Sequence, residues 1–180
     1  MNKNVIVIST SLRKGGNSDT LADELIRGAK DAGTNVEKIS LEGKTIGFCK
    51  GCLVCQKTQK CVIKDDADNI AQKVKNADGI VFATPIYYYE MSGQMKTLLD
   101  RLNPLFPSDY TFREVYMIAT AADENPESVD VAVKGLEGWI ACFDKAKLSG
   151  VIRGIGVTDI GDIKHHEKLM SEAYEMGKAI

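Results

Sequence analysis

The sequence predicts a doubly wound α/β fold, in which five parallel strands form a sheet between two layers of helices. Short runs rich in Val and Ile alternate with amphipathic segments along the whole chain. Residues 79–84 are almost entirely apolar, as expected of a strand that is buried on both faces. Strands that alternate with helices favour a parallel sheet covered on both sides, and 180 residues suit about one domain.

Each element follows from its own pattern. Asn17 or Ser18 is expected to cap the first helix, and Gly33 is expected to stop it. An irregular loop with four cysteines, residues 42–64, follows the second strand as an insertion in a single domain that spans residues 1–180. We call it the cysteine loop. The expected strands are 3–10, 35–41, 79–84, 114–122 and 148–157; the expected helices are 17–31, 65–77, 92–102, 129–147 and 163–180.

The charge balance excludes some classes of partner. The chain carries 23 Lys and Arg against 25 Asp and Glu, a formal net charge of −2, which argues against a nucleic-acid-binding surface. The apolar run at residues 5–8 is far shorter than the roughly 20 residues of a membrane helix, and no signal-peptide pattern is present. The sequence therefore predicts a cytoplasmic protein with no membrane or nucleic-acid partner.

In a doubly wound sheet, ligands bind beyond the carboxyl ends of the strands, where the strand order reverses. The first loop there, residues 9–18, offers hydroxyls, cations, two glycines and a helix N-terminus, which together suit a phosphate group. It matches neither the dinucleotide-binding nor the P-loop pattern. The alternative is an ordinary polar turn before a helix.

A second loop is expected at residues 85–91, after the buried third strand. It carries three adjacent tyrosines, Tyr87, Tyr88 and Tyr89. Aromatic walls beside backbone donors suit a planar heterocycle, but tyrosine is equally common at interfaces with other proteins.

Three motifs together resemble the NADPH-dependent FMN reductase and flavodoxin-like family: Ser9-x-Ser11-x-Arg13-x3-Asn17-Ser18, Thr84-Pro85-Ile86-Tyr87, and residues 96–101, Lys-Thr-Leu-Leu-Asp-Arg. The number of strands and the length of the chain fit the flavodoxin-like strand order 2-1-3-4-5. The resemblance implies a non-covalent FMN, with NAD(P)H as the electron donor. It implies no catalytic side chain, because the flavin performs the chemistry. The implied FMN-binding residues are Ser9, Ser11, Arg13, Asn17, Ser18, Pro85, Ile86, Tyr87, Tyr88, Thr120, Ala121 and Ala122.

The cysteines Cys49, Cys52, Cys55 and Cys61 follow the spacing C-x2-C-x2-C-x5-C. This motif is similar to a sub-branch of the family that includes iron–sulfur flavoproteins, and the four thiolates could hold one [4Fe–4S] cluster. Thiols without a cluster, a zinc site or a disulfide remain alternatives. Because the loop leaves the second strand, it is expected to emerge near the flavin.

Other chemically active side chains have simpler interpretations. Lys96 and Asp100 have the spacing of an ion pair on a helix. Cys142 is expected to pack in the core, and the adjacent His165 and His166 make a poor metal-binding pair.

The sequence thus predicts an FMN-dependent oxidoreductase that passes electrons from NAD(P)H to a flavin, a quinone or a similar small acceptor, as a homodimer or homotetramer. One alternative is an electron carrier with FMN and [4Fe–4S] that exchanges electrons with a ferredoxin-like protein. Others are a quinone, nitro or azo reductase, and a binding module without a redox role.

Overall fold

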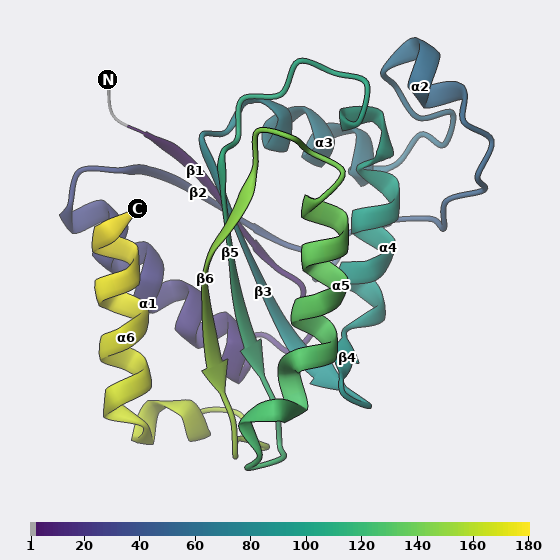
Figure 1. The fold of residues 1–180 in the computed structure, drawn as a ribbon. Helices are drawn as coiled ribbons and strands as arrows, with labels where there is room; N and C mark the ends of the chain where they lie inside the picture. The colour runs from purple at the N-terminus through teal and green to yellow at the C-terminus, as the bar shows by residue number, and fades with distance from the viewer. Residues whose placement is uncertain (1–2) are drawn as a thin grey trace.

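The structure is a computed structural model that describes residues 3–180, and it confirms the predicted α/β class. Five parallel strands lie in the order β2-β1-β3-β5-β6 (Figure 1), which is the predicted order 2-1-3-4-5 for the long strands. The short strand β4 (Glu90–Met91) adds one antiparallel pairing to β3. The long strands are β1 (Asn4–Ser9), β2 (Asn35–Ser40), β3 (Gly79–Tyr87), β5 (Glu114–Thr120) and β6 (Lys147–Gly154).

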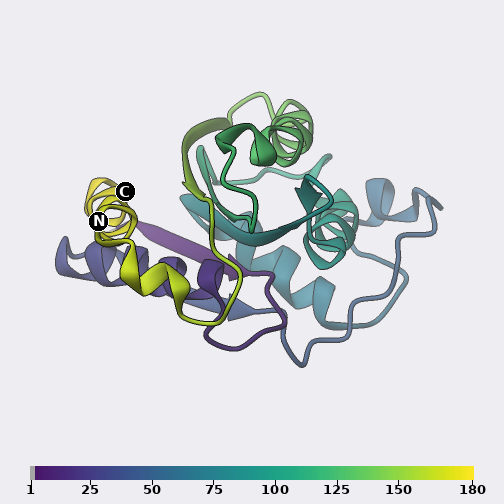
Figure 2. The ribbon, with the colours of Figure 1, turned by 90° about the horizontal axis from the view of Figure 1, so that it is seen from below.

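Helices cover both faces of the sheet and complete the three layers. Figure 2, seen along the strands, shows α1 and α6 on one face and α3, α4 and α5 on the other. The two apolar cores match these layers, since Val5, Val7 and Val81 face α1, whereas Ile6, Ile80 and Phe82 face the opposite helices. The helices are α1 (Asn17–Asp31), α2 (Val54–Thr58), α3 (Asp66–Asn76), α4 (Gly93–Arg101), α5 (Asp130–Ile140) and α6 (Glu167–Ala179).

The outer helices α1 and α6 approach each other very closely. An added Cβ atom at Gly28 would lie 2.0 Å from the carbonyl oxygen of Tyr174, and one at Gly177 would lie 2.0 Å from that of Leu25. Only glycine fits at these two contacts, because backbone rather than a movable side chain stands in the way. The close contact fixes α6 against the helix that begins at the first carboxyl-edge loop.

Several predicted boundaries were right. Gly33 ends α1 with a positive φ of 87°, and the side chains of Asp65 and Ser92 cap α3 and α4 by accepting hydrogen bonds from Ala67 N and Met95 N.

Other boundaries were wrong. Gly16, not Asn17 or Ser18, is the N-cap of α1. Residues 85–91 are a β-hairpin rather than a loop, because β3 continues to Tyr87 and pairs with β4. The cysteine loop contains the short helix α2.

The helix predicted for residues 129–147 ends at Ile140. Beyond this point Phe143 turns inward and joins an aromatic cluster with Tyr110, Phe112 and Trp139. Cys142 is therefore exposed, which corrects the expectation that it packs in the core.

Gly177→Ala is expected to lower the free energy of unfolding by about 1–3 kcal/mol, because the new methyl group overlaps the backbone of α1. The matched control is Gly138→Ala on α5, where an added Cβ meets nothing within 4 Å. That change is expected to stabilise the protein by up to about 1 kcal/mol through helix propensity. Urea denaturation of both variants measures the two effects, and equal stabilisation by both would contradict the close contact.

Candidate functional site

A cavity of about 190 Å³ lies at the carboxyl edge of the sheet, where β1, β3, β5 and β6 end. We call it the edge cavity. Segments that are far apart in the sequence form its walls, because the carboxyl ends of parallel strands meet at one edge. The lining residues are Ser11, Arg13, Gly16, Asn17, Ser18, Pro85, Ile86, Tyr87, Thr120, Ala122, Val157 and Thr158.

The first wall is the turn that leads into α1. Ser11 Oγ accepts a hydrogen bond from Arg13 N at 3.1 Å, and Gly16 N donates to Arg13 O at 2.9 Å, which curls the loop around the helix start. A Cβ atom at Gly16 would lie 3.0 Å from Ser11 Oγ, so a side chain would fill the cradle. Among residues 3–180, no side chain caps α1, so the N-terminus of a 15-residue helix faces the cavity with its partial positive charge.

The acidic residue in this first turn is neutralised by a cation. Lys38 lies 2.7 Å from Asp19 and 2.6 Å from Asp23. Burial raises the pKa of Asp19, but the hydrogen bond and charge of Lys38 outweigh this effect and hold the pKa below its ordinary value. The helix end therefore keeps its attraction for anions despite the nearby carboxylate.

The segment after β6 forms a wall that the sequence reasoning missed. Asn17 Nδ2 donates to Asp159 O at 3.0 Å, and Asn17 Oδ1 accepts from Ile163 N at 3.2 Å. Arg13 Nη1 donates to Thr158 O at 3.1 Å. The side chain of Asn17 thus fastens the segment to α1, which brings Val157 and Thr158 into the wall.

Asp162 shapes the same segment from within. Its Oδ2 atom accepts hydrogen bonds from Thr158 N at 2.9 Å and Asp159 N at 2.7 Å. These backbone hydrogen bonds lower the pKa of Asp162, so the carboxylate that holds the turn stays ionised at neutral pH.

The tyrosine hairpin forms the rim of the cavity. Tyr88 and Tyr89 form its two-residue turn with positive φ values of 52° and 66°, a conformation that usually selects Asn or Gly. Tyr89 Oη lies 3.3 Å from Asp123 Oδ2, in the loop after β5. The strained turn leaves Tyr88 99% exposed and keeps it out of the wall, whereas Tyr87 lines it.

Buried hydroxyl groups hold the base of this hairpin. Ser92 Oγ lies 3.1 Å from Thr10 Oγ1 and 3.2 Å from Thr84 Oγ1. Thr84 Oγ1 also accepts from Ser92 N at 3.0 Å. The contacts join the ends of β1 and β3 to the start of α4, so the first loop and the hairpin are held in one arrangement.

Nine of the twelve predicted FMN-binding residues line the edge cavity. The three that do not are Ser9, Ala121 and Tyr88. Ser9 and Ala121 are buried in or directly after their strands, and Tyr88 points outward from the hairpin turn. The structure adds Gly16, Val157 and Thr158 to the wall.

The cysteine loop does not stay near the edge cavity, contrary to the prediction. It leaves the carboxyl end of β2, but Figure 1 shows α2 beside the opposite end of α4, away from the arrowheads of β3, β5 and β6. The physical reason is Arg101, the last residue of α4, whose side chain is fully buried.

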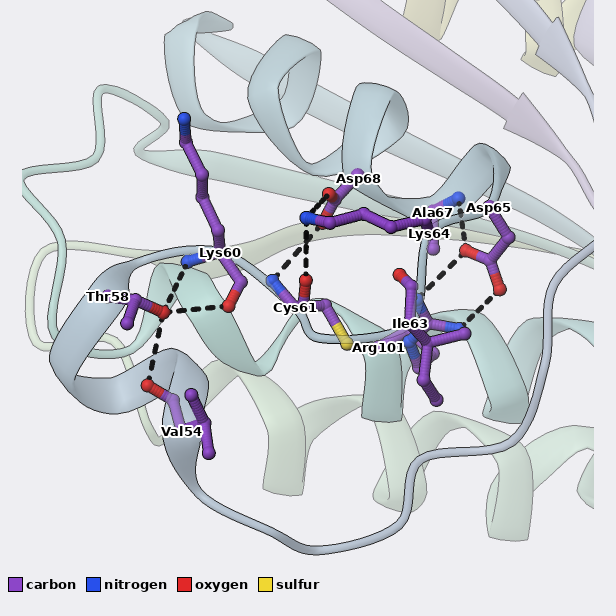
Figure 3. A network of polar contacts seen from close by, with 10 residues as sticks. All are labelled: Val54, Thr58, Lys60, Cys61, Ile63, Lys64, Asp65, Ala67, Asp68 and Arg101. Atoms are coloured by element: carbon purple, nitrogen blue, oxygen red, sulfur yellow. Dashed lines mark hydrogen bonds and ion pairs between the residues drawn. The ribbon is translucent and has the colours of Figure 1, made fainter.

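Arg101 clamps the two ends of the loop together. Its guanidinium donates to both carboxylate oxygens of Asp65, at 2.6 and 2.9 Å (Figure 3). It also donates to Gly47 O at 2.8 Å and Ile63 O at 3.1 Å. The hydrogen bonds to Asp65 and the nearby thiol of Cys61 raise the pKa of Arg101 despite its burial. A bidentate pair of this kind fixes orientation as well as position.

The loop sulfurs lie among N–H donors. Cys55 is buried and its Sγ accepts from Asn103 Nδ2 at 3.2 Å, while Cys49 Sγ accepts from Gly51 N at 3.4 Å. Figure 3 shows the Cys61 thiol pointing toward Arg101, whose Nε is buried without a hydrogen-bond partner among residues 3–180.

A second cavity of about 410 Å³ lies between the cysteine loop and the ends of α4 and α5. We call it the thiol cavity, because Cys49 and Cys142 both line it. Asn103 lines it as well, together with Trp139 and Phe143. Within the described part of the chain, no three His, Cys, Asp or Glu side chains are gathered as a metal site.

The remaining predicted side chains have plain structural roles. Lys96 and Asp100 form the predicted ion pair at 2.7 Å, and both are exposed. His165 belongs to a short 3-10 turn, and His166 precedes α6. No helix between residues 3 and 180 has the length and apolar character needed to span a membrane.

Comparison with known proteins assigns the family that this fold and site suggest. A model of the NADPH-dependent FMN reductase family matches residues 3–134, and the chain belongs to that family. It is 31% identical to a Bacillus subtilis protein named as an NAD(P)H-dependent FMN-containing oxidoreductase, over 97% of this chain and 96% of that protein.

Two further similarities concern a second relative and the fold. The chain is 43% identical to an iron–sulfur flavoprotein of Methanocaldococcus jannaschii, over 56% of this chain and about half (52%) of that protein. The fold matches an azoreductase of Bacillus anthracis with a TM-score of 0.75 at 15% identity, over the whole of both chains.

Asp65→Ala is expected to lower the free energy of unfolding by about 3–5 kcal/mol, because it leaves the buried guanidinium of Arg101 unpaired. Chemical denaturation at pH 7 measures the loss. The matched control is Asp100→Ala, which removes an exposed ion pair and should cost under about 1 kcal/mol.

The Asp65–Arg101 pair also predicts a dependence on pH. Burial raises the pKa of Asp65, but hydrogen bonds from Arg101 and two backbone amides hold it below its ordinary value of 3.8. The stabilisation is therefore complete above that value and is lost as the pH falls through the lower pKa of the folded state. The stability difference between wild type and Asp65→Asn should be constant near neutrality and shrink below about pH 4. A stability difference that stays constant down to pH 2 would contradict the Asp65–Arg101 ion pair.

Proposed function

We propose that this protein is an FMN-dependent NAD(P)H oxidoreductase whose flavin occupies the edge cavity. The observation that carries the proposal is the meeting around one cavity of three separate groups of predicted FMN-binding residues, in the segments 11–18, 85–87 and 120–122, beside the uncapped N-terminus of α1. The family match and the full-length Bacillus subtilis relative support the same activity.

The residues of the cavity fit the two ends of FMN. Its phosphate has a cradle of the hydroxyls of Ser11 and Ser18 and the backbone N–H groups at the uncapped start of α1, with the charge of Arg13 beside it. Its ring has a flat wall from Pro85 to Tyr87 and a second wall at Thr120 and Ala122. A bound FMN would supply the redox chemistry, hydride transfer from the nicotinamide and electron transfer to an acceptor, while these residues would hold its two ends.

The chain's own residues bind and orient. The hydroxyls of Thr10, Ser92 and Thr84 fix the hairpin relative to the first loop, residues 9–18. The sites for the two ends of the ligand therefore keep a fixed position relative to each other. Among residues 3–180, no carboxylate, imidazole, thiol or lysine side chain lines the cavity, whose ionisable side chains are Arg13 and the phenol of Tyr87. This lining suits chemistry that needs no carboxylate or imidazole from the protein.

The edge cavity is open on one side, which supports a single binding position for the electron donor and the electron acceptor. We propose that NAD(P)H and a small acceptor such as a flavin or quinone bind in turn at the exposed ring face, next to Tyr87. The exposed Tyr88 and Tyr89 on the rim support a homodimer or homotetramer in which a second copy covers the hairpin. The same open cavity suits a reductase that acts on diffusible small molecules.

A second cofactor is proposed for the cysteine loop. Cys49, Cys52, Cys55 and Cys61 provide the four thiolates that a [4Fe–4S] cluster needs, and N–H donors to Cys49 and Cys55 are already present. Because the thiols are not gathered in residues 3–180, loading requires the loop between Gly47 and Ile63 to close around the cluster. A cluster in this loop would transfer single electrons, and a ferredoxin-like protein is the partner that suits such transfer.

Arg13→Ala is expected to weaken FMN binding by about 1–3 kcal/mol, the range for a lost charge-assisted hydrogen bond. Lys14→Ala removes the same charge one residue away, from a position outside the edge cavity, and should have a smaller effect. Fluorescence titration of the apoprotein with FMN measures both. Equal effects of the two substitutions would show that Arg13 acts only through general charge.

The activity itself is tested by anaerobic reduction. NADH or NADPH is expected to bleach the flavin absorbance of the protein, and an added quinone or free flavin is expected to restore it. A flavin that dithionite bleaches but neither nucleotide does would contradict the reductase and favour the carrier. The flavin released by acid should be FMN, because the chain offers one phosphate cradle at the edge cavity.

A further inference from the structure

We propose that Lys38 is a positioning residue that sets the preference of the edge cavity for a phosphorylated flavin, and that it acts through Asp19. The inference rests on the proposed FMN site, but Lys38 lies on β2, outside the lining of that cavity. FMN differs from riboflavin only in its phosphate. A residue that tunes the charge at the start of α1 should therefore act on the binding of FMN and not on that of riboflavin.

Asp19 holds the first loop in shape from within α1. Its Oδ2 atom accepts a hydrogen bond from Gly15 N at 3.2 Å, and the neighbouring Thr20 Oγ1 donates to Gly15 O at 3.3 Å. Gly15 has a positive φ of 68°, and these two contacts fasten its turn to the first turn of α1. The loop therefore needs a hydrogen-bond acceptor at position 19.

The same carboxylate opposes an anionic ligand. Asp19 is the third residue of α1, and a full negative charge in the first turn repels a phosphate that binds at the uncapped helix start. The loop needs the acceptor, whereas the phosphate needs a positive potential. A cation that pairs with Asp19 satisfies both requirements.

Lys38 is that cation. Its Nζ atom lies 2.7 Å from Asp19 Oδ1 and 2.6 Å from Asp23 Oδ1, and the side chains of Lys38 and Asp19 are only 26% and 14% exposed. Burial lowers the pKa of Lys38, but hydrogen bonds to the two carboxylates outweigh this effect and raise the pKa above its ordinary value. Asp23 is 61% exposed and lies one turn further along α1, so water screens its charge more effectively.

The ion pair lies directly behind the loop that would hold the phosphate. Asp19 and Lys38 line a cavity of about 250 Å³, and Ser11 and Arg13 line both this cavity and the edge cavity. The first loop therefore separates the ion pair from the ligand. A change of charge at Lys38 acts on the phosphate across this loop and leaves the walls for the flavin ring unchanged.

The test compares FMN with riboflavin in fluorescence titrations of the full chain after its flavin has been removed. Lys38→Met keeps the length of the side chain and removes its charge, which leaves the charge of Asp19 uncompensated. We expect FMN to bind about 3–10-fold more weakly and riboflavin to bind as it does to wild type. The difference should shrink at about 1 M salt, where the screening length is roughly 3 Å. Lys38→Arg keeps the charge and should retain the FMN affinity.

A second substitution at position 19 provides the rescue. In Asp19→Asn the amide oxygen can still accept from Gly15 N, but the negative charge is gone. The double variant Asp19→Asn, Lys38→Met should therefore bind FMN within about twofold of wild type. This rescue decides the question even where riboflavin binds too weakly to titrate.

Lys73→Met is the matched control. It removes a cation that pairs with Glu37, also on β2, beside cavities that do not include the first loop, and should change neither affinity. Circular dichroism reports the fold of every variant. Should Lys38→Met not fold, Lys38→Gln is judged by the same titrations.

The outcomes separate this inference from the proposed function. A wild-type chain that binds FMN, with a folded Lys38→Met that binds it equally well, overturns the role of Lys38 and leaves the FMN site standing. An equal loss of riboflavin affinity, or a double variant that binds no better than Lys38→Met, shows a structural effect and also overturns the role. A wild-type chain that binds no FMN overturns the proposed site and this inference with it.

Discussion

The parallel arrangement of the five long strands is the constraint on which both candidate sites depend. It brings the carboxyl ends of β1, β3, β5 and β6 to one edge, so loops from residues 10 to 163 meet there. It also forces each helix of the outer layers to run back toward the opposite edge. The start of α1 therefore lies in the edge cavity and the start of α4 lies behind it, whereas the end of α4 lies toward the other end of the molecule.

The buried ion pair between Arg101 and Asp65 depends on the direction in which α4 runs. Arg101 ends α4, so its guanidinium lies far from the edge cavity, and every group that it binds is drawn to that end. Burial of an arginine is tolerable because two carboxylate oxygens and two carbonyl oxygens accept its hydrogen bonds. One ion pair thus closes the cysteine loop and separates its thiols from the flavin-binding loops of the same chain.

Local sequence patterns predicted the features that depend only on residues nearby in the sequence. The helix starts expected at residues 65 and 92 are the positions where Asp65 and Ser92 cap α3 and α4, and Gly33 was the expected stop of α1, because each residue acts within a few residues of its own position. The strand order followed from the number of strands and the length of the chain.

Features that depend on distant partners were not predictable. Asn17 was expected to cap α1, but its amide is used by Asp159 and Ile163, more than 140 residues away. The wall at Val157 and Thr158 follows from that contact and had no signal in its own segment. The place of the cysteine loop depends on Arg101, 36 residues beyond Asp65, and nothing in the cysteine spacing reports it.

Helix α4 connects the two ends physically. Its first turn is capped by Ser92, which belongs to the hydroxyl contacts behind the edge cavity, and its last residue is Arg101. Nine helical residues span about 14 Å, so the helix sets a fixed separation between the two groups of residues. Its inner face is held by buried Met95, Leu98 and Leu99, which leaves little freedom for one end to move without the other. The motif at residues 96–101 therefore has a structural role. It holds the edge cavity and the thiol cavity at a fixed separation.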